Sequence, residues 1–327
     1  MKFNKYTPSL KRIEFMLSPA ITLKQLRALL VVAEHRSLTA AAEVLHQTTP
    51  AIHSQIHKLE DLAGCPLLIR GGDGAGFVLT DQGAALARAA RRVMSNLSQA
   101  EAEIAALARG DKGHVRMSVV STGKYIAPRL VRMLQDAHPD IRISLRVGNR
   151  QQVIADLEQE AADLAVMGRP PRGPLLMTEP LGPHPHGIIL PPGHRLAGLD
   201  GFDPAILMQE TFLAREPGSG TRSVMLRYFD RLAEGIEPPM ITMESNETIK
   251  QAVMAGLGIA FLSLHTCDDE LRAGRLVALR GPGLPLMRQW YLVRAYRDES
   301  LAAAQILADQ IVALGGRYLP RPPGGFN

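Results

Sequence analysis

Residues 37–60, with the sequence SLTAAAEVLHQTTPAIHSQIHKLE, predict two short helices joined by a tight turn. Ser37 and Thr48 stand where helix N-caps are expected. Pro50 falls in the first turn of the second helix, where its missing N–H costs little. One face of this second helix is apolar, with Ile52, Ile56 and Leu59. The opposite face is polar and carries Thr49, His53, Ser54, His57 and Lys58.

A third helix is predicted immediately before this pair. Its apolar residues recur at helical spacing, at Leu26, Leu29, Leu30 and Ala33. The middle helix has a face of small and aliphatic residues, formed by Ala40, Ala41, Val44 and Leu45. Two short helices and a turn, with donors on the exposed side of the second helix, are what reading of a DNA major groove requires. The alternative is a three-helix packing unit whose polar face only meets water.

Residues 26–60 also resemble the helix-turn-helix of LysR-type transcriptional regulators. The resemblance is carried by Ala33-Glu34, Ser37-Leu38-Thr39, Ala41-Ala42-Glu43, Leu45, Pro50-Ala51-Ile52, Gln55-Ile56 and Leu59-Glu60. Residues 64–70 (GCPLLIR) and 79–83 (LTDQG) resemble that family's wing and the start of its linker helix. The resemblance implies base contacts from Thr49, Pro50, His53 and Ser54, and phosphate contacts from Thr39, Thr48, Lys58 and Arg70.

Two departures from the family pattern affect this implication. Thr48 and Thr49 stand where the family usually has Ser-Gln, and His53 stands where Ser is usual. Glutamine can pair bidentately with adenine and threonine cannot, so the base preference does not transfer from relatives. Residues 71–76 (GGDGAG) replace a loop that is normally basic, so weaker contact with the DNA backbone is expected there.

Length and composition exclude several classes of protein. The chain has 327 residues, enough for about two domains, and its 46% hydrophobic and 21% charged residues exclude a largely disordered protein. No run approaches ~18 uninterrupted apolar residues and no signal peptide is visible, so a cytoplasmic protein without a membrane span is expected. Two cysteines provide no disulfide framework. The net charge of +5 is concentrated in residues 1–110, which favours a polyanion partner for that part.

Residues 80–109 predict a long helix with a heptad repeat. The apolar positions alternate at spacings of four and three, at Leu86, Ala90, Val93, Leu97, Ala100, Ile104 and Leu107. Such a seam favours pairing with a second chain, as a homodimer or homotetramer, and Gly110 is a plausible C-cap. The alternative is a monomer in which the helix packs on its own C-terminal domain.

After residue 110 short strands alternate with helices. Strands are expected at 115–120, 141–147 and 162–167, and helices at 124–138 and 151–159, which is the βαβαβ pattern of a parallel sheet. A Pro/Gly-rich break at 179–183 leads to a second lobe with a strand at 187–190, helices at 222–233 and 247–255, and a strand at 259–263. The strand at 290–295 and the helix at 301–314 are expected to return to the first lobe, and residues 320–327 to form a loose tail.

These patterns predict the following organisation. An all-α winged helix-turn-helix occupies residues 1–79 and a linker helix residues 80–110. An α/β two-lobed domain, like a periplasmic binding protein, occupies residues 111–327. Within it, lobe I takes residues of about 113–183 and 286–317, and lobe II takes 184–285.

The loops of the α/β part are rich in donors for an anion. Open α/β sheets bind ligands at the carboxyl ends of their strands, where helix N-termini favour negative charge. The residues expected around a small anionic metabolite are Ser121, Thr122, Lys124, Asn149, Arg150, Arg169, Ser219, Thr221, Arg222 and Asn246. The alternative is that the Ser, Thr and Asn residues are only N-caps and the arginines surface charges.

Within the LysR type, residues 22–295 resemble the CbbR subgroup, which regulates Calvin-cycle carbon-fixation genes. The resemblance is most specific at residues 147–150, 167–171, 215–222 and 245–263. It implies coinducers or corepressors that are phosphorylated, such as ribulose bisphosphate, phosphoglycolate, phosphoenolpyruvate or NADPH. The expected partners are double-stranded promoter DNA and, for an activator, RNA polymerase, and repression is the alternative to activation. No cofactor and no catalytic residue is expected.

Three rival interpretations are weaker. An α/β enzyme lacks support, because the run Gly218-Ser219-Gly220-Thr221 has neither the spacing nor the lysine of a P-loop. His184 and His186 suggest a metal pair but lie in the Pro-rich crossover without a third ligand, so no metal site is expected and a hinge loop is favoured. A redox sensor would need contact between Cys65 and Cys267, which belong to different predicted domains.

Overall fold

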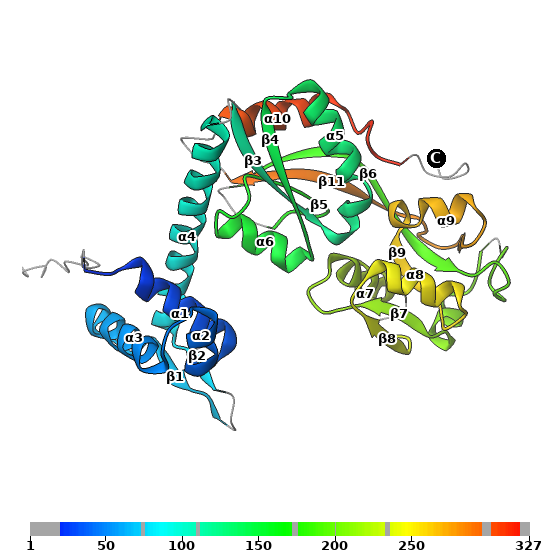
Figure 1. Cartoon of the computed structure of the whole chain (residues 1–327). Coiled ribbons are helices and arrows are strands. Elements are labelled where there is room, and N and C mark those ends of the chain that lie inside the picture. Colours follow the sequence, from blue (N-terminus) through cyan, green and yellow to red (C-terminus); the bar gives the residue numbers. More distant parts are fainter. Residues whose placement is uncertain are drawn as a thin grey trace, which may run out of the picture. The chain divides into compact units, whose positions relative to one another are not determined.

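The computed structural model describes residues 20–72, 76–108, 112–171, 176–199, 201–232, 236–295 and 302–320 (Figure 1). Its contacts divide the chain into two compact units, Met1–Ser95 and Asn96–Asn327. In the described part of the chain, no helix combines the length and the apolar character that crossing a membrane requires.

Three helices form the body of the N-terminal unit, as predicted: α1 Leu23–His35, α2 Leu38–Val44 and α3 Thr49–Ala63. Their N-caps come from the expected residue types. The hydroxyl of Ser37 accepts a hydrogen bond from the Ala40 N–H at 3.2 Å, and that of Thr48 accepts one from the Ala51 N–H at 3.4 Å. The cap of α1 is Thr22, which forms a capping box with Gln25.

The core-facing sides of the first two helices differ from the prediction. Leu26 and Leu29 are buried in α1 as expected, but the third turn directs Val32 to the core, and Leu30 and Ala33 lie only half-buried. In α2 the buried pair is Ala41 and Ala42, while Val44 is 50% exposed. The two small alanines let α2 approach α1 and α3 closely, which turns the larger Val44 outward. The face of α3 is confirmed, with Ile52, Ile56 and Leu59 all buried.

A two-stranded wing and a long helix complete this part of the chain. Strands β1 Leu68–Arg70 and β2 Phe77–Leu79 pair in antiparallel fashion. Helix α4 runs over Asp81–Ala108, and the Thr80 hydroxyl accepts a hydrogen bond from the Gly83 N–H at 2.9 Å in its first turn. Gly110, the expected C-cap, lies outside the described residues, as do residues 73–75 of the wing loop.

The C-terminal unit begins with the predicted parallel strands. These are β3 Gly113–Val120, β4 Ile141–Gly148 and β5 Leu164–Met167, and β3 pairs with both of the others. The helices between them are α5 Ala127–Ala137 and α6 Arg150–Glu158. Residues 121–125, which include the start of the first expected helix, instead form the 3-10 helix η2 Ser121–Tyr125. Strand β11 Leu286–Ala295 and helix α10 Ala302–Ala313 return to the same apolar core, as predicted; we call the elements around this core lobe I.

Lobe II consists of the elements that pack around two further apolar clusters. Its strands are β7 Phe212–Arg215, β8 Met240–Met243, β9 Ala260–Ser263 and β10 Val277–Ala278. Its helices are α7 Gly220–Leu232, α8 Asn246–Met254 and α9 Asp268–Arg272, with the short 3-10 turns η3 Pro204–Gln209 and η4 Leu264–Thr266. Figure 1 shows α7 and α8 beside β7 and β9 in this lobe.

The predicted break at residues 179–183 was wrong. Strand β6 runs without interruption over Leu176–Leu190; residues 176–186 pair with β11, and the end of the strand pairs with β9 and β10. Residues two apart in a strand direct their N–H groups to the same edge, so Pro183 and Pro185 together remove donors from one edge only. The pairing with β11 survives there, with a bulge between Trp290 and Tyr291. His184 and His186 therefore lie on a strand that both lobes share, and not in a hinge loop.

Gly83 provides a test of the packing between the wing and α4. A Cβ at this position would lie 2.0 Å from the backbone carbonyl oxygen of Leu67, and backbone cannot move aside cheaply. We expect Gly83→Ala to destabilise the N-terminal unit by about 1–3 kcal/mol, as overpacking does. Hydrogen exchange of peptides from α1–α3, followed by mass spectrometry, should then be faster by roughly 5- to 150-fold.

Gly72→Ala is the matched control, because an added Cβ there meets nothing within 4 Å. Equal exchange rates in the two variants would contradict the assigned packing.

Candidate functional site

The structure places the residues expected to contact DNA on the surface of the N-terminal unit. Pro50, His53, Ser54 and Lys58 are exposed on one face of α3, and Thr49 is half-buried at its first turn. The expected phosphate contacts Thr39, Thr48 and Arg70 are also exposed. The face is therefore available to a groove, with donors at its N-terminal end.

Sequence reasoning missed one bond that fixes the turn before α3. The Gln55 amide donates to the Gln47 side-chain oxygen at 2.7 Å and so joins the turn to α3. His46 in that turn has φ 51°, a left-handed conformation that residues other than glycine rarely adopt. The bond between Gln47 and Gln55 restrains the turn and thereby the angle between α2 and α3.

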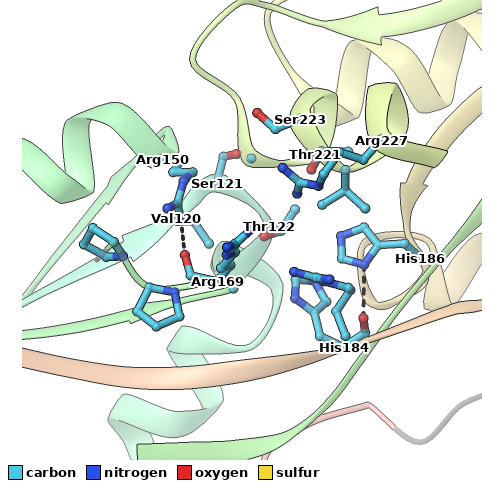
Figure 2. A pocket seen from close by; sticks show the side chains of 16 residues that line it. Val120, Ser121, Thr122, Arg150, Arg169, His184, His186, Thr221, Ser223 and Arg227 are labelled. Carbon is cyan, nitrogen blue, oxygen red and sulfur yellow. Dashed lines mark hydrogen bonds between the residues drawn. The ribbon is translucent and has the colours of Figure 1, made fainter. Parts of the chain in front are cut away.

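A cavity of about 250 Å³ lies between the two lobes of the C-terminal unit (Figure 2). Lobe I contributes the end of β3, η2, the start of α6 and the residues after β5, and lobe II contributes the first two turns of α7. The shared strands β6 and β11 contribute His184, His186 and Arg288. In Figure 2, Arg150 and Arg169 face Thr221, Ser223 and Arg227 across the cavity.

Five of the ten residues expected around a metabolite line this cavity: Ser121, Thr122, Arg150, Arg169 and Thr221. The sequence analysis missed Arg227, Arg288, His184, His186 and Ser223. Helical periodicity contained a signal for Arg227, since Thr221, Val224 and Arg227 recur at intervals of three on one face of α7. No comparable signal marked Arg288, because its place depends on the pairing of β11 with β6, where it lies opposite His184.

The other five expected residues do not line the cavity, and each has a different contact. Lys124 forms an ion pair with Glu247, and the Asn149 side chain caps α6 by accepting from the Gln152 N–H at 3.0 Å. Arg222 donates to the Arg215 carbonyl oxygen at 3.0 Å. The side chains of Ser219 and Asn246 are buried, and the Asn246 oxygen accepts from Arg215. These contacts agree with the alternative interpretation as caps and structural groups, and a role of these five residues in ligand binding stays a prediction.

The cavity concentrates positive charge. Within the described residues, none of the four arginines that line it, Arg150, Arg169, Arg227 and Arg288, forms an ion pair with a carboxylate. Burial lowers the pKa of Arg150, and the neighbouring Arg169 and Arg227 lower it further. Burial and the charges of Arg288 and Arg169 likewise lower the pKa of Arg227. The four guanidinium groups stay charged at neutral pH and repel one another, so an anion between them is favourable.

Beside the cavity, buried Arg215 of lobe II joins the two lobes. Its guanidinium pairs bidentately with Glu216 at 2.7 and 2.9 Å, and donates to the Asn246 oxygen at 2.7 Å. The same nitrogen that bonds Asn246 also donates to the Ser121 hydroxyl of lobe I at 3.0 Å. Arg215 therefore positions Ser121 at the cavity wall.

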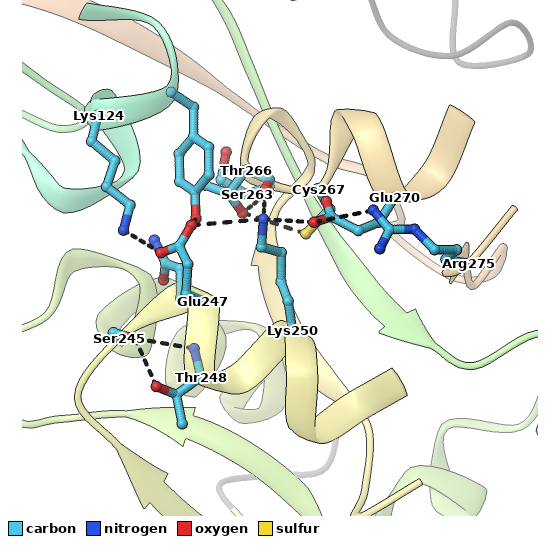
Figure 3. A network of polar contacts seen from close by, with 12 residues as sticks. Lys124, Ser245, Glu247, Thr248, Lys250, Ser263, Thr266, Cys267, Glu270 and Arg275 are labelled. Carbon is cyan, nitrogen blue, oxygen red and sulfur yellow. Dashed lines mark hydrogen bonds and ion pairs between the residues drawn. The ribbon is translucent and has the colours of Figure 1, made fainter. Parts of the chain in front are cut away.

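A second polar connection between the lobes is centred on Glu247 of α8 (Figure 3). Its carboxylate accepts from Lys124 and from the Tyr125 hydroxyl, both of η2, and lies 3.7 Å from the Lys250 ammonium. Lys250 in turn pairs with Glu270 at 2.9 Å and donates to the Thr266 carbonyl oxygen at 3.0 Å. We call this set of contacts the Glu247 network. It ties η2, which forms part of the cavity wall, to lobe II.

Two features of the described residues concern metal ligands and the buried cysteine Cys267. No group of three or more His, Cys, Asp or Glu side chains there is arranged to hold a metal ion. Cys267 is fully buried, and burial raises the pKa of its thiol to about 12. A thiol with so high a pKa gives little thiolate, which is the form that reacts with oxidants.

The Glu247 network predicts a pH-dependent contribution to stability. Burial opposes ionisation of Glu247, but the hydrogen bonds from Lys124 and Tyr125 outweigh it and hold the pKa below its ordinary value. Because its pKa is lower in the folded protein, the ionised Glu247 stabilises the folded state at pH values above 4.5, the ordinary pKa of glutamate. This stabilisation is lost as the pH falls through the folded-state pKa. The Glu247 side chain is 45% exposed, so Glu247→Gln should cost only about 0–1 kcal/mol at pH 7.

Urea denaturation at pH 7 and at pH 3.5 measures this cost. The difference between wild type and variant should shrink at the lower pH, whereas Glu158→Gln, on the exposed surface of α6, should change stability at neither pH. A larger difference at pH 3.5 would contradict the assignment.

Comparison with known proteins assigns both parts of the chain to one family. Residues 23–84 match the bacterial regulatory helix-turn-helix of the lysR family, and residues 108–315 match the LysR substrate binding domain. The chain is 54% identical over 304 residues to the HTH-type transcriptional regulator CbbR of Cereibacter sphaeroides, which covers 93% of this chain and 98% of that protein. It is 41% identical to the RuBisCO operon transcriptional regulator of Allochromatium vinosum, over 84% of this chain and 89% of that one.

The C-terminal unit also resembles a solved structure with a bound ligand. That structure is the regulatory domain of CcmR from Synechocystis PCC6803 in complex with 2-PG; it is 31% identical, with a TM-score of 0.58, and covers 62% of this chain and 97% of that domain. Both CbbR and the Allochromatium vinosum protein are named as transcriptional regulators and not as enzymes. The chain belongs to the LysR family of transcriptional regulators.

Proposed function

We propose that this LysR-type regulator controls carbon-fixation genes and binds a small phosphorylated anion, such as 2-phosphoglycolate, in the cavity between its lobes. The observation that carries the proposal is the set of four arginines around the cavity without a carboxylate partner in the described residues. Relatives named as RuBisCO operon regulators support the target genes, and the CcmR complex supports the class of ligand. No cofactor is proposed; the anion acts as an effector.

The proposed contacts with the effector come from both lobes. Arg150 and Arg169 extend from lobe I and Arg227 from lobe II, and bidentate guanidinium contacts suit phosphate and carboxylate oxygens. Ser121, Thr122 and Thr221 add hydroxyl donors beside them. A ligand that bonds both lobes lowers the free energy of the arrangement in which they lie close together.

A path from the cavity to the linker helix is present within the C-terminal unit. Strand β3 ends at η2 on the cavity wall, and nearer its start it carries Arg116. Arg116 pairs with Asp163 at 2.9 Å and donates to the side-chain oxygen of Gln99, on α4, at 2.8 Å. We propose that movement of η2 on effector binding reaches α4 along this strand.

On the DNA side, we propose that a homodimer or homotetramer places α3 in the major groove of promoter DNA in the cytoplasm. Thr49, Pro50, His53 and Ser54 would contact bases, and Thr39, Thr48, Lys58 and Arg70 would contact phosphates. The domain boundaries at residues 79 and 110 remain part of this proposal. So does contact with RNA polymerase.

Dimerisation would use the exposed seam of α4. Val93, Leu97 and Ile104 are 39%, 42% and 67% exposed, at the predicted heptad positions, although apolar side chains of this size favour burial. A partner helix would cover them. The proposal follows from this exposure together with the spacing.

The arginine contacts are tested by calorimetric titration with 2-phosphoglycolate. Arg227→Ala and Arg150→Ala should each weaken binding by about 10- to 150-fold, which is the value of one or two charged hydrogen bonds. Arg231→Ala is the matched control, because Arg231 lies one turn further along α7 and does not line the cavity. Equal affinities in all three variants and wild type would overturn the proposed site.

The dimer is tested with Leu97→Glu combined with Ile104→Glu. Two buried carboxylates per helix cannot pair across the seam, so sedimentation should show a monomer, and affinity for the promoter of a RuBisCO operon should fall by at least about tenfold. Asn96→Glu, on the exposed side of the same turn, should leave both unchanged. A dimer that persists in the double variant would place the interface elsewhere.

A further inference from the structure

Three histidines and a tryptophan form one stacked cluster at the side of the cavity made by the shared strands. His184 stacks on Trp290 with ring centroids 3.7 Å apart, and its ring centroid lies 4.3 Å from that of His186. The ring centroid of His265, in η4, lies 5.9 Å from that of His184. His184 and His186 are buried and line the cavity together with four arginines (Figure 2).

Obligatory partners fix the protonation sites of two of these rings. The His186 Nδ1 lies 3.0 Å from the His184 carbonyl oxygen, which can only accept, so Nδ1 carries a proton. The Trp290 Nε1–H can only donate, so the Nδ1 of His265 accepts it at 3.1 Å, and the neutral His265 ring carries its proton on Nε2. A neutral His186 therefore offers a lone pair on Nε2, an atom without a hydrogen-bond partner in the described part of the chain.

His184 has a similar unpaired nitrogen. Its Nε2 lies 2.9 Å from the Ser263 hydroxyl, but its buried Nδ1 has no partner among the described residues. This Nδ1 faces Gly168 on the cavity wall, where a Cβ would lie 3.8 Å away. The pair therefore has two nitrogens without a partner in the described part of the chain, the His186 Nε2 and the buried His184 Nδ1.

Burial, assisted by neighbouring positive charges, keeps the pair neutral in the free protein. Burial lowers the pKa of His186 to about 4 and holds that of His184 well below its ordinary value. The charged and titratable groups that face the pair are Arg288 of β11, His265 of η4, and the cavity arginines Arg227 of α7 and Arg169 after β5. The neighbouring β9 contributes only Ser263 and Phe261, and η2 contributes Thr122. Burial lowers the pKa of His265 to about 4, and the charge of Asp268 in α9 opposes this shift only in part.

The negative charge of a phosphorylated anion in the cavity would oppose the electrostatic effect of the arginines on the two histidine rings. Above pH 7 a phosphate monoester is mainly a dianion whose oxygens only accept hydrogen bonds. The free lone pair of a neutral His186 also only accepts, so the two cannot bond unless a proton lies between them. The negative charge beside the rings favours their charged form in the same way. One imidazolium charge on the pair satisfies the contact, and a second is opposed by the short distance between the rings.

We propose that binding of a phosphorylated anion in this cavity takes up one proton from solvent, which the His184–His186 pair holds against the phosphate. This inference rests on the function proposed above. The regulator then responds to the effector and to pH together, because the complex holds one more proton than the free partners do. Effector affinity rises as the pH falls, by about tenfold per pH unit between pH 6.5 and 7.5.

Calorimetric titration with 2-phosphoglycolate at pH 7.5, in buffers of different ionisation enthalpy, measures proton uptake directly. The full-length protein should take up about one proton per ligand bound. His184→Gln combined with His186→Asn should reduce the uptake to near zero while retaining weaker binding. These side chains keep a donor for the His184 carbonyl oxygen and a partner for Ser263, but cannot titrate. His138→Gln, which does not line the cavity, should leave the uptake unchanged.

The outcomes separate the inference from the proposed function. Binding without proton uptake in the wild type, or equal uptake in wild type and double variant, overturns the inference and leaves the proposed function intact. Absence of binding of 2-phosphoglycolate overturns both. Should the double variant fail to fold, ¹⁵N spectra of the wild-type imidazoles decide: ligand addition at pH 7.5 should convert one ring of the pair to the imidazolium signature, and unchanged neutral signatures would refute the inference.

Discussion

The mutual repulsion of four arginines around one cavity is the constraint on which the C-terminal unit depends. Arg150, Arg227 and Arg288 come from α6, α7 and β11, Arg169 follows β5, and none of the four has a carboxylate partner in the described residues. A folded protein tolerates such a cluster because the guanidinium groups remain partly solvated and one of them, Arg150, bonds the Arg169 carbonyl oxygen. An anion between the four groups would reduce this repulsion, which is the physical basis of the proposed effector site.

The fold allows that anion to act on more than its own pocket. Strands β6 and β11 run through both lobes, so the lobes share one sheet, and the cavity lies where the shared strands meet η2 and α7. Arg215 and Glu247 already connect lobe II to η2 through Ser121, Lys124 and Tyr125. An effector adds contacts to a junction that is already bonded, and β3 extends from that junction toward Gln99 of α4. Ligand recognition and the linker helix are thereby parts of one connected structure within the unit.

Local signals in the sequence predicted most of the elements. The caps Ser37 and Thr48, the apolar face of α3 and the alternation of strands and helices after residue 112 all depend on neighbours in the chain. The errors arose where contacts between segments distant in the sequence decide the local structure. Pro183 and Pro185 suggested a break, yet β11 holds that segment in a strand. The faces of α1 and α2 shifted because alanines set how closely the helices approach.

The candidate site likewise contains residues that local sequence patterns reveal and residues that only tertiary pairing places. Ser121, Thr122, Arg150, Arg169 and Thr221 follow strand ends or begin helices, which a sequence pattern can reveal. Arg288 and the two histidines line the cavity only because β6 and β11 pair in register. Lys124 does not line it because it pairs with Glu247, and Arg222 does not because it bonds the Arg215 carbonyl oxygen. A donor-rich loop thus predicts a binding region, while the partners available after folding decide which donors remain free for a ligand.

A crystal structure of the protein with 2-phosphoglycolate tests the central claim most directly. Phosphate density among the guanidinium groups of Arg150, Arg169 and Arg227, beside His186, is the result that this account predicts. Density for the ligand at another site, with the interlobe cavity filled only by water at saturating ligand, would contradict it.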